Sequence, residues 1–219
     1  SDVYKRQIDD EDAKDFDDAI WAEPDTTKDN PGGWKLITAI ADVSHYVKPH
    51  SALDRDAQTR GNSVYLPSKV VPMLPEALST EWCSLKPNEN RACLAARIRL
   101  SKVGEIKDYN FVRGIIRTVA RLTYAEAEAH HTGKQTHKTT PVGPQIANLY
   151  GAYAVLRQAR AARKTLDFDL PETKIVFDHS GKIITIEPRP HYDSHRLIAV
   201  SYTHLRAHET DSYLVCRLL

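Results

Sequence analysis

Hydrophobic and polar positions alternate with two different periods along the chain, and the changes of period mark its predicted secondary structure. Two-residue alternation and β-branched runs predict strands at 19–23, within 34–47 (ending near Asp42 and Ser44) and at 63–66, then hairpins of 92–100 with 105–120 and of 174–178 with 182–187. Helical spacing predicts helices at 52–60, 124–131 and 145–164, and a last one that begins near Ser194. Ser51 and Thr123 stand at N-cap positions, and Gly61 ends the first helix. Pro67, Pro72 and Pro75 predict an extended, turning path. Because strands and helices are interspersed, the pattern predicts an α+β domain.

The two ends of the chain match each other as nucleic acid. Residues 1–7 can be encoded by TCA GAT GTG TAT AAG AGA CAG, whose reverse complement in a shifted frame encodes residues 200–204. Two protein termini have no physical reason to be related in this way, and both strings resemble a transposon-end adaptor of sequencing libraries. We therefore expect residues 1–7 and 200–219 to be adaptor-like and to make few native contacts, and residues 8–199 to form one partial domain.

Composition changes this picture only modestly. The whole chain has a formal net charge of +1, and removing both ends leaves 26 basic and 26 acidic residues. A self-sufficient nucleic-acid binder is usually basic, so neutrality weakens that class unless other domains capture the ligand. Cys83 and Cys93 form no CxxC pair, which argues against zinc and favours free thiols in a reducing, cytoplasmic compartment. No apolar run approaches the ~20 residues that a membrane span needs, so we expect no membrane partner.

Seven carboxylates crowd the thirteen residues from Ile8 to Ile20. Carboxylates this dense either spread into solvent, as in an acidic disordered tail, or converge on a cation. Phe16 and the strand pattern that follows favour a folded acidic site. An EF-hand loop starting at Asp10 lacks the required residues at two positions, and the strand that should precede a phosphatase Asp-x-Asp motif is missing. Magnesium-assisted phosphoryl transfer fits best, because Mg²⁺ prefers oxygen ligands and two such ions can activate water. The aspartates with the appropriate spacing are Asp9, Asp15, Asp17 and Asp18.

Further short motifs follow the acidic run in order. They are Ala39–Val47, Asp54–Gly61, Ser63–Pro67, Pro72–Pro75, Cys83–Leu85, Arg121–Tyr124, Asp167–Pro171 and His195–Ile198. Together with the acidic run they resemble the catalytic domain of the RNB family, and most closely its bacterial ribonuclease R branch. The resemblance implies the N-terminal and middle part of an RNB catalytic domain, with a mixed sheet and packed helices. It also implies a processive 3′-to-5′ exoribonuclease that hydrolyses single-stranded RNA with Mg²⁺ and releases nucleoside 5′-monophosphates.

The resemblance also implies roles for single residues in the acidic run. Asp17 matches the catalytic aspartate whose loss abolishes cleavage with little loss of RNA binding. Three others match aspartates that hold metal, namely Asp9, Asp15 and Asp18.

Aromatic residues of the motifs match RNA-binding positions of the family. Tyr65 and Phe168 match the pair that clamps the stacked 3′-terminal bases, and such stacking suits a sequence-tolerant enzyme. Tyr124 matches a tyrosine near the terminal nucleotide that is associated with selection of RNA over DNA. Without the resemblance, we would assign Tyr65 and Phe168 to the core and Tyr124 to packing.

The chain departs from the family after Ile198. There the family continues with paired glutamates and a helical segment that carries an arginine-rich active-site motif, whereas this chain continues into its adaptor-like end. We therefore expect the 219-residue chain to be inactive, and we expect flanking cold-shock-type and S1-type RNA-binding domains in the full-length protein. Two alternatives remain: a non-catalytic RNA-binding or scaffold protein on a decayed nuclease domain, and a metal-dependent phosphatase or phosphodiesterase for small substrates.

Overall fold

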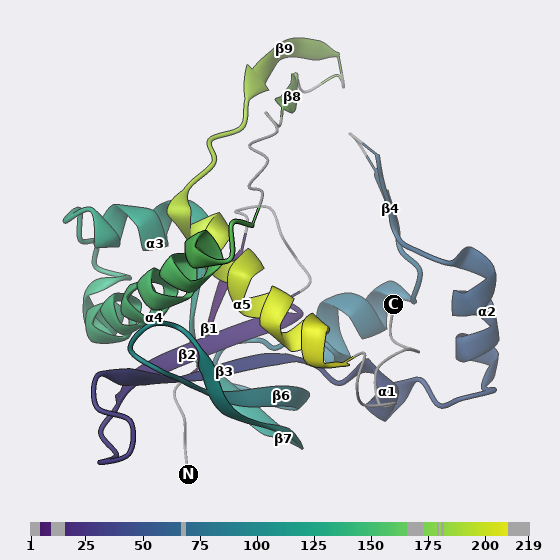
Figure 1. Ribbon diagram of the computed structural model, residues 1–219. Helices are drawn as coiled ribbons and strands as arrows, with labels where there is room; N and C mark the ends of the chain where they lie inside the picture. Colours follow the sequence, from purple (N-terminus) through teal and green to yellow (C-terminus); the bar gives the residue numbers. More distant parts are fainter. Residues whose placement is uncertain are drawn as a thin grey trace.

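Five strands form a closed barrel, and helices cover one side of it (Figure 1). The computed structural model describes residues 5–9, 16–66, 69–165, 173–178, 180 and 182–209. The strands of the barrel follow in the order β1 (Lys5–Asp9), β2 (Asp18–Asp25), β3 (Gly33–Ala41), β6 (Asn90–Leu100) and β7 (Ile106–Thr123). Neighbouring strands are antiparallel, except that β1 pairs with β7 in parallel and so closes the barrel. This mixed sheet with packed helices confirms the predicted α+β class.

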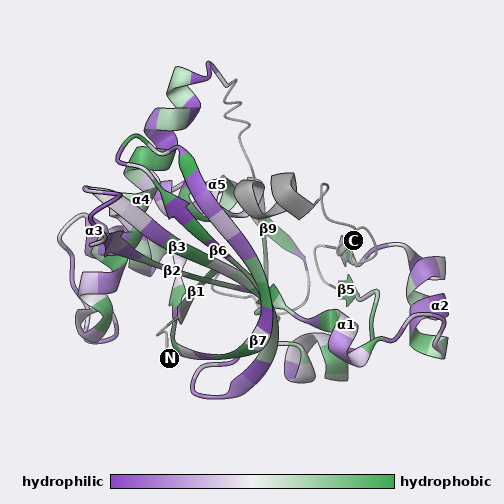
Figure 2. Ribbon diagram, turned by 60° about the horizontal axis from the view of Figure 1, so that its bottom comes forward, coloured by the Kyte–Doolittle hydropathy of each residue, from purple (hydrophilic) through white to green (hydrophobic). Residues whose placement is uncertain are grey.

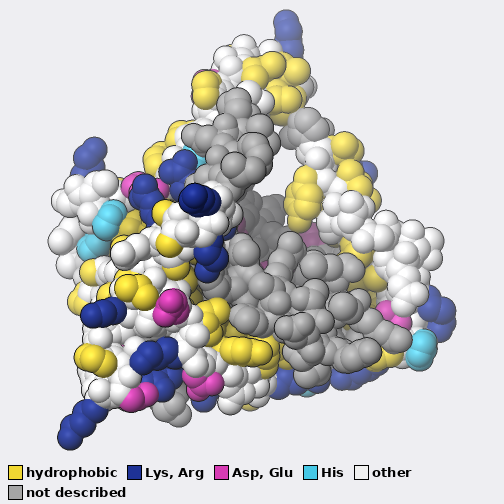
Figure 3. Space-filling view, viewed as in Figure 1, with side chains coloured by type: hydrophobic (Ala, Val, Ile, Leu, Met, Phe, Trp, Pro, Cys, Tyr) yellow, Lys and Arg dark blue, Asp and Glu magenta, His cyan; other side chains and the backbone are white. Residues whose placement is uncertain are grey.

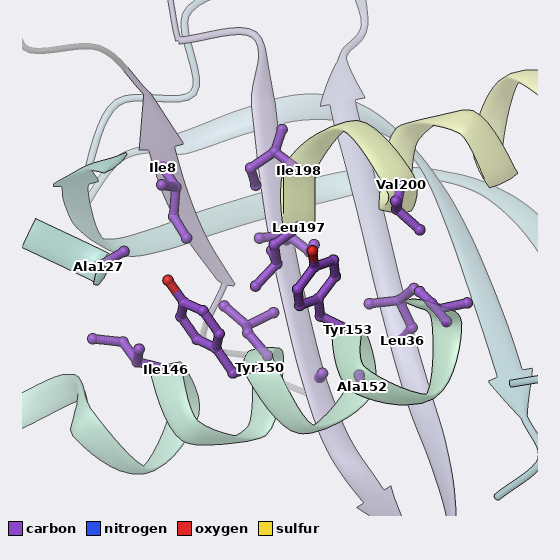
Figure 4. Close-up of a cluster of buried hydrophobic side chains, with 14 of the residues drawn as sticks. Ile8, Leu36, Ala127, Ile146, Tyr150, Ala152, Tyr153, Leu197, Ile198 and Val200 are labelled. Atoms are coloured by element: carbon purple, nitrogen blue, oxygen red, sulfur yellow. The ribbon is translucent and has the colours of Figure 1, made fainter. Parts of the chain in front are cut away.

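The covering layer consists of the helices α3 (Tyr124–His131), α4 (Gly143–Ala162) and α5 (Asp193–Glu209). Helix α4 buries side chains at a spacing of three and four residues, among them Ile146, Leu149, Tyr153 and Leu156. They pack with side chains of the barrel strands and with Leu197 and Ile198 of α5 (Figure 4). Each fully buried side chain of this size stabilises the fold by roughly 1.5–3 kcal/mol, which fixes the helices on the barrel. No helix in the described ranges is long and apolar enough to cross a bilayer.

A second apolar cluster lies on the other face of the same strands. It contains Ala39 and Ala41 of β3, the loop residue Leu85, and the thiols of Cys83 and Cys93. Both cysteines are buried and free, as the sequence predicts. Hydrophobic and hydrophilic residues both occur along strand β7, as the colours in Figure 2 show, and buried and exposed positions are mixed along it.

Smaller elements extend from the barrel. They are α1 (Val43–Tyr46), α2 (Ala52–Arg60), β4 (Val64–Leu66), β5 (Lys69–Val71), a π-helical turn η1 (Ala77–Trp82), a 3-10 turn η2 (Thr140–Val142), β8 (Thr173–Phe177) and β9 (Ile183–Pro188). The β4–β5 and β8–β9 pairs are separate two-stranded sheets. Strand β9 exposes Ile183, Ile184 and Ile186, and hydrophobic side chains are visible on this projecting arm at the top of Figure 3.

The predicted helices at 52–60 and 124–131 are confirmed together with their caps. The Ser51 hydroxyl accepts a hydrogen bond from the Asp54 amide, and Gly61 adopts a φ of 78°, which glycine tolerates without strain. Thr123 and Glu126 form a reciprocal capping box at the start of α3.

Two local predictions are confirmed. The strand predicted to end near Asp42 and Ser44 ends at Ala41, because the Asp42 carbonyl accepts a hydrogen bond from the His45 amide and the chain turns into α1. Strand β5 lies on the path between Pro67 and Pro75, which the sequence predicts to be extended and turning, and the π-helical turn η1 follows after Pro75.

The expectation that both ends make few native contacts is wrong for the described residues. Lys5–Gln7 pair with β7 through their backbones. Val200 and Ser201 are buried, and the Tyr202 hydroxyl donates a hydrogen bond of 2.7 Å to the Ala39 carbonyl. These residues continue elements whose cores belong to the domain, namely β1 and α5. The adaptor-like origin of the ends stays a prediction.

Candidate active site

Three of the four predicted aspartates lie at one end of the barrel. Strand β1 ends at Asp9 and its antiparallel neighbour β2 begins at Asp18, so these residues and Asp17 share that end. The Ala41 amide donates a hydrogen bond of 2.8 Å to the Asp17 carbonyl, which extends the β2–β3 pairing by one step. The side chain of Asp17 is exposed, and those of Asp9 and Asp18 are half-buried. The fourth, Asp15, lies outside the described residues.

The segment before Asp17 is held by a loop that is distant in sequence. The Phe16 amide donates to the Ser84 hydroxyl at 3.2 Å, and the Leu85 amide donates to the Phe16 carbonyl at 2.7 Å. The guanidinium carbon of Arg121 lies 4.5 Å from the centre of the Phe16 ring. The sequence shows Cys83–Leu85 as a motif, but no pattern in it indicates that this motif contacts the acidic run.

A buried carboxylate supports the same end of the barrel. Asp42 accepts two hydrogen bonds from Arg113, at 2.9 and 3.0 Å, and one of 2.6 Å from Ser44. Burial opposes ionisation of Asp42, but these hydrogen bonds outweigh it and hold the pKa below its usual range. A shallow depression of about 290 Å³ beside Asp42 is lined also by His45, Lys48 and Arg113.

The thiol of Cys83 lies close to the carboxylates of Asp17 and Asp42. Burial, followed by the negative charges of Asp17 and Asp42, raises its pKa to about 11. Cys83 is therefore protonated at neutral pH and is not poised to act as a nucleophile.

Tyr124 lies beside Asp9. The parallel register of β1 and β7 pairs Asp9 with Thr123, and Tyr124 is the next residue. Its ring stacks on His195 of α5 with 3.9 Å between ring centres, and the Ser194 hydroxyl donates to the Tyr124 carbonyl at 2.9 Å. The start of α5 therefore fixes Tyr124 next to the acidic end of the barrel.

Tyr202 also lies at this end, although no motif in the sequence indicated it. Burial, then the charge of Asp18 and a hydrogen bond with it, raises the pKa of the Tyr202 hydroxyl well above its usual value. The proximity of Asp18 and Tyr202 follows from the continuation of α5, since Tyr202 lies beyond the motif that ends at Ile198.

Tyr65, another predicted aromatic residue, is not part of this group. Tyr65 lies on the separate β4–β5 hairpin, opposite Val70, and its side chain is 67% exposed. It is therefore not a core residue. Phe168 lies outside the described residues.

The donor chemistry at the acidic end suits a hard cation. Asp9, Asp17 and Asp18 offer carboxylate oxygens from two adjacent strand ends, and Mg²⁺ is commonly held by one or two carboxylates. Within the described part of the chain, no group of three or more His, Cys, Asp or Glu side chains forms a ready metal site. The described aspartates therefore fit Mg²⁺ in ligand type and share one end of the fold, but by themselves they do not form a complete metal site.

The barrel with its acidic end has the fold of an RNB domain: residues 5–205 match that domain, and the chain belongs to the RNB family. It is 44% identical over 193 residues to ribonuclease R of Vibrio parahaemolyticus, across 87% of this chain and 23% of that protein. The structure is similar to that of Mycoplasma genitalium RNase R in complex with ribose methylated single-stranded RNA, with a TM-score of 0.84 and 30% identity over 91% of this chain and 31% of that one. These matches confirm the resemblance drawn from the motifs.

A more distant likeness concerns the fold alone. Yeast Ssd1, a pseudonuclease, matches with a TM-score of 0.59 and 20% identity over 74% of this chain and 18% of that one. In every one of these comparisons, the chain spans less than a third of the length of the protein it matches.

Proposed function

We propose that the full-length protein is a Mg²⁺-dependent exoribonuclease that degrades single-stranded RNA processively from the 3′ end and releases nucleoside 5′-monophosphates. The observation that carries the proposal is the placement of Asp9, Asp17 and Asp18 at one end of an RNB barrel. Carboxylates brought together in this way repel one another, and a bound cation removes that cost. The ribonuclease R relatives support the reaction class.

Individual aspartates have separate roles in the proposal. Asp9, Asp15 and Asp18 hold the metal through their carboxylate oxygens, and Asp17 supplies a negative charge at the same two-metal site on which hydrolysis depends. Bound Mg²⁺ would supply activation of water and stabilisation of the leaving oxygen. Asp42 supports this end from outside the ligand set, since Arg113 already neutralises its charge.

The aromatic residues recognise RNA in the proposal. Tyr65, which is exposed, and Phe168 stack against the bases near the 3′ end, and each stacked base contributes roughly 1–3 kcal/mol in any sequence. Tyr124 is next to the residue paired with Asp9, a location that suits a hydroxyl directed at the 2′-OH of the terminal nucleotide. Single-stranded RNA bound to the Mycoplasma genitalium relative supports this choice of ligand.

We also propose a cytoplasmic location and flanking cold-shock-type and S1-type domains. The two buried free thiols suit a reducing compartment. The greater length of the ribonuclease R relatives leaves room for such domains.

The competing function is that of a non-catalytic RNA-binding or scaffold protein, and the likeness to a pseudonuclease keeps it as an alternative. The retained aspartates favour catalysis, because a module that only binds RNA has no need for a set of mutually repelling carboxylates.

Asp17→Asn in the full-length protein tests the proposal. Asn keeps the size of the side chain and one oxygen but removes the charge, so hydrolysis should be abolished while RNA affinity stays within a few-fold. Release of 5′-nucleotides from single-stranded RNA is measured with and without a chelator. Asp56→Asn, at an exposed carboxylate of α2, is the matched control and should keep wild-type turnover.

Three results would contradict the proposal. Wild-type turnover by the Asp17→Asn variant would remove Asp17 from the site. An inactive wild-type protein that still binds RNA would favour the scaffold function, and release of phosphate from small esters would favour a phosphatase.

A further inference from the structure

The loop that contains Ser84 and Leu85 binds the backbone of Phe16, the residue directly before Asp17. The Phe16 amide donates to the Ser84 hydroxyl at 3.2 Å, and the Phe16 carbonyl accepts from the Leu85 amide at 2.7 Å. Both backbone groups of one residue are therefore bound by two consecutive residues of the loop. On the far side of Asp17, its carbonyl accepts from the Ala41 amide at 2.8 Å.

This loop is itself rigidly anchored. Ser84 and Leu85 are both 0% exposed. The Ser84 carbonyl accepts from the Arg91 guanidinium at 3.0 Å, and the Leu85 carbonyl accepts from the buried Thr118 hydroxyl at 2.9 Å. Because β6 and β7 provide these two anchors, the position of the Ser84 hydroxyl is set by the barrel.

Asp17 is the residue directly after Phe16, whose backbone is held by Ser84 and Leu85. A carboxylate at a metal site must be held in place by its supporting groups, and losing such a group commonly costs 10–100-fold in metal affinity. The backbone at Phe16 and Asp17 is fixed on both sides, while the Asp17 side chain itself is exposed. The supporting contacts thus act through the backbone and leave the carboxylate oxygens available.

We propose that Ser84 is a positioning residue for the acidic site: its buried hydroxyl fixes the Phe16 amide and thereby sets where Asp17 presents its carboxylate. The inference rests on the proposed function, since it assigns Ser84 a role at the same metal site. Ser84 touches neither metal nor RNA in this role, and its effect passes through the backbone of Phe16.

Ser101 provides a matched control. It is also a buried serine, and its hydroxyl accepts from the backbone amides of Val103 and Glu105. It follows Leu100, which pairs with Trp34 at the opposite end of β3 from Ala41. Seven residues of strand at about 3.3 Å each place the two serines roughly 20 Å apart. Loss of either hydroxyl leaves partly buried hydrogen bonds to backbone amides unmade, so both alanine variants should lower the urea midpoint of unfolding.

The experiment measures Mn²⁺ binding by electron paramagnetic resonance on the full 219-residue chain, for the wild type and for Asp17→Asn, Ser84→Ala and Ser101→Ala. We expect Ser84→Ala to weaken Mn²⁺ binding about tenfold and Ser101→Ala to leave it within twofold. Should Ser84→Ala fail to fold, Ser84→Cys keeps the volume with a weaker acceptor and should show an intermediate loss.

The outcomes separate the inference from the proposed function. Weak binding by Asp17→Asn with wild-type binding by the Ser84 variants overturns the inference and leaves the proposed site intact. Equal Mn²⁺ binding by the wild type and Asp17→Asn overturns the contribution of the Asp17 charge to the metal site, which belongs to the proposed function. Hydrogen exchange at the Phe16 amide tests the positioning role of Ser84 directly. Exchange at least tenfold faster than in the wild type for Ser84→Ala, but not for Ser101→Ala, supports this role. An unchanged exchange rate in Ser84→Ala overturns it.

Discussion

Arg113→Met should destabilise the protein at neutral pH by leaving Asp42 buried without its cation. Asp42 is only 5% exposed, and the guanidinium of Arg113 binds both of its carboxylate oxygens. Methionine keeps most of the aliphatic stem of arginine and removes all of its donors. The perturbation is therefore mainly electrostatic.

The size of the effect follows from the unequal exposure of the two side chains. That of Asp42 is 6% exposed and that of Arg113 is 56% exposed. Exposed ion pairs contribute about 0.2–1 kcal/mol, whereas breaking a buried pair costs about 3–5 kcal/mol. Solvent around Arg113 screens part of the interaction, so we expect the free energy of unfolding to fall by about 2 kcal/mol at pH 7.

The stability difference between Arg113→Met and the wild type should also change with pH, in a direction that tests the role of Asp42. In the wild type the pKa of Asp42 lies below its unfolded value, so ionised Asp42 adds stability above about pH 4 that is lost as pH falls further. Without Arg113, burial is the largest remaining influence on Asp42 and is opposed only by the hydrogen bonds from Ser44 and His45, so the pKa of Asp42 should rise above its value in the wild type. Protonation of Asp42 then relieves the penalty, and the difference between the variant and the wild type should shrink as the pH approaches 4.

Urea unfolding of the wild type, Arg113→Met, Asp42→Asn and the double variant at pH 7 and near pH 4 tests this reasoning. The double variant should lose at least about 1 kcal/mol less than the sum of the single losses, because the two residues share one interaction. A coupling below about 0.5 kcal/mol at pH 7, or a loss in Arg113→Met that is the same at both pH values, would refute it.

Two further predictions concern packing and RNA binding. Gly151→Ala should lower the free energy of unfolding by about 1–3 kcal/mol, because its added Cβ would lie 2.3 Å from the Trp34 ring, whereas Gly114→Ala meets no atom within 4 Å and should be neutral in the same urea assay. Tyr65→Ala should leave stability within about 0.5 kcal/mol but change the length of the end products of the full-length enzyme, since the ring is exposed and stacking contributes about 1–3 kcal/mol. Val71→Ala on the same hairpin is the control, and unchanged product lengths for Tyr65→Ala would exclude its stacking role.

Local sequence signals predicted the elements that depend on neighbouring residues. The helix at 124–131 is correct to the residue, because Thr123 and Glu126 cap it with contacts three residues apart. The hairpin of 92–100 with 105–120 corresponds to β6 and β7. The acidic run and the ordered motifs were sufficient to indicate the family, since residue identity in order is what a family match measures.

The sequence by itself therefore determined the helices, the hairpins, the family and the aspartates to consider. Tertiary structure alone decided that β1 closes the barrel in parallel with β7, which brings Tyr124 next to Asp9. It also decided that Ser84 binds Phe16 across 68 positions and that Arg113 binds Asp42 across 71. Periodicity reports only which face of an element is apolar, and it carries no information on which distant backbone groups meet. Those contacts arise when the closed barrel fixes the register of every strand at once, and the candidate site is built from them.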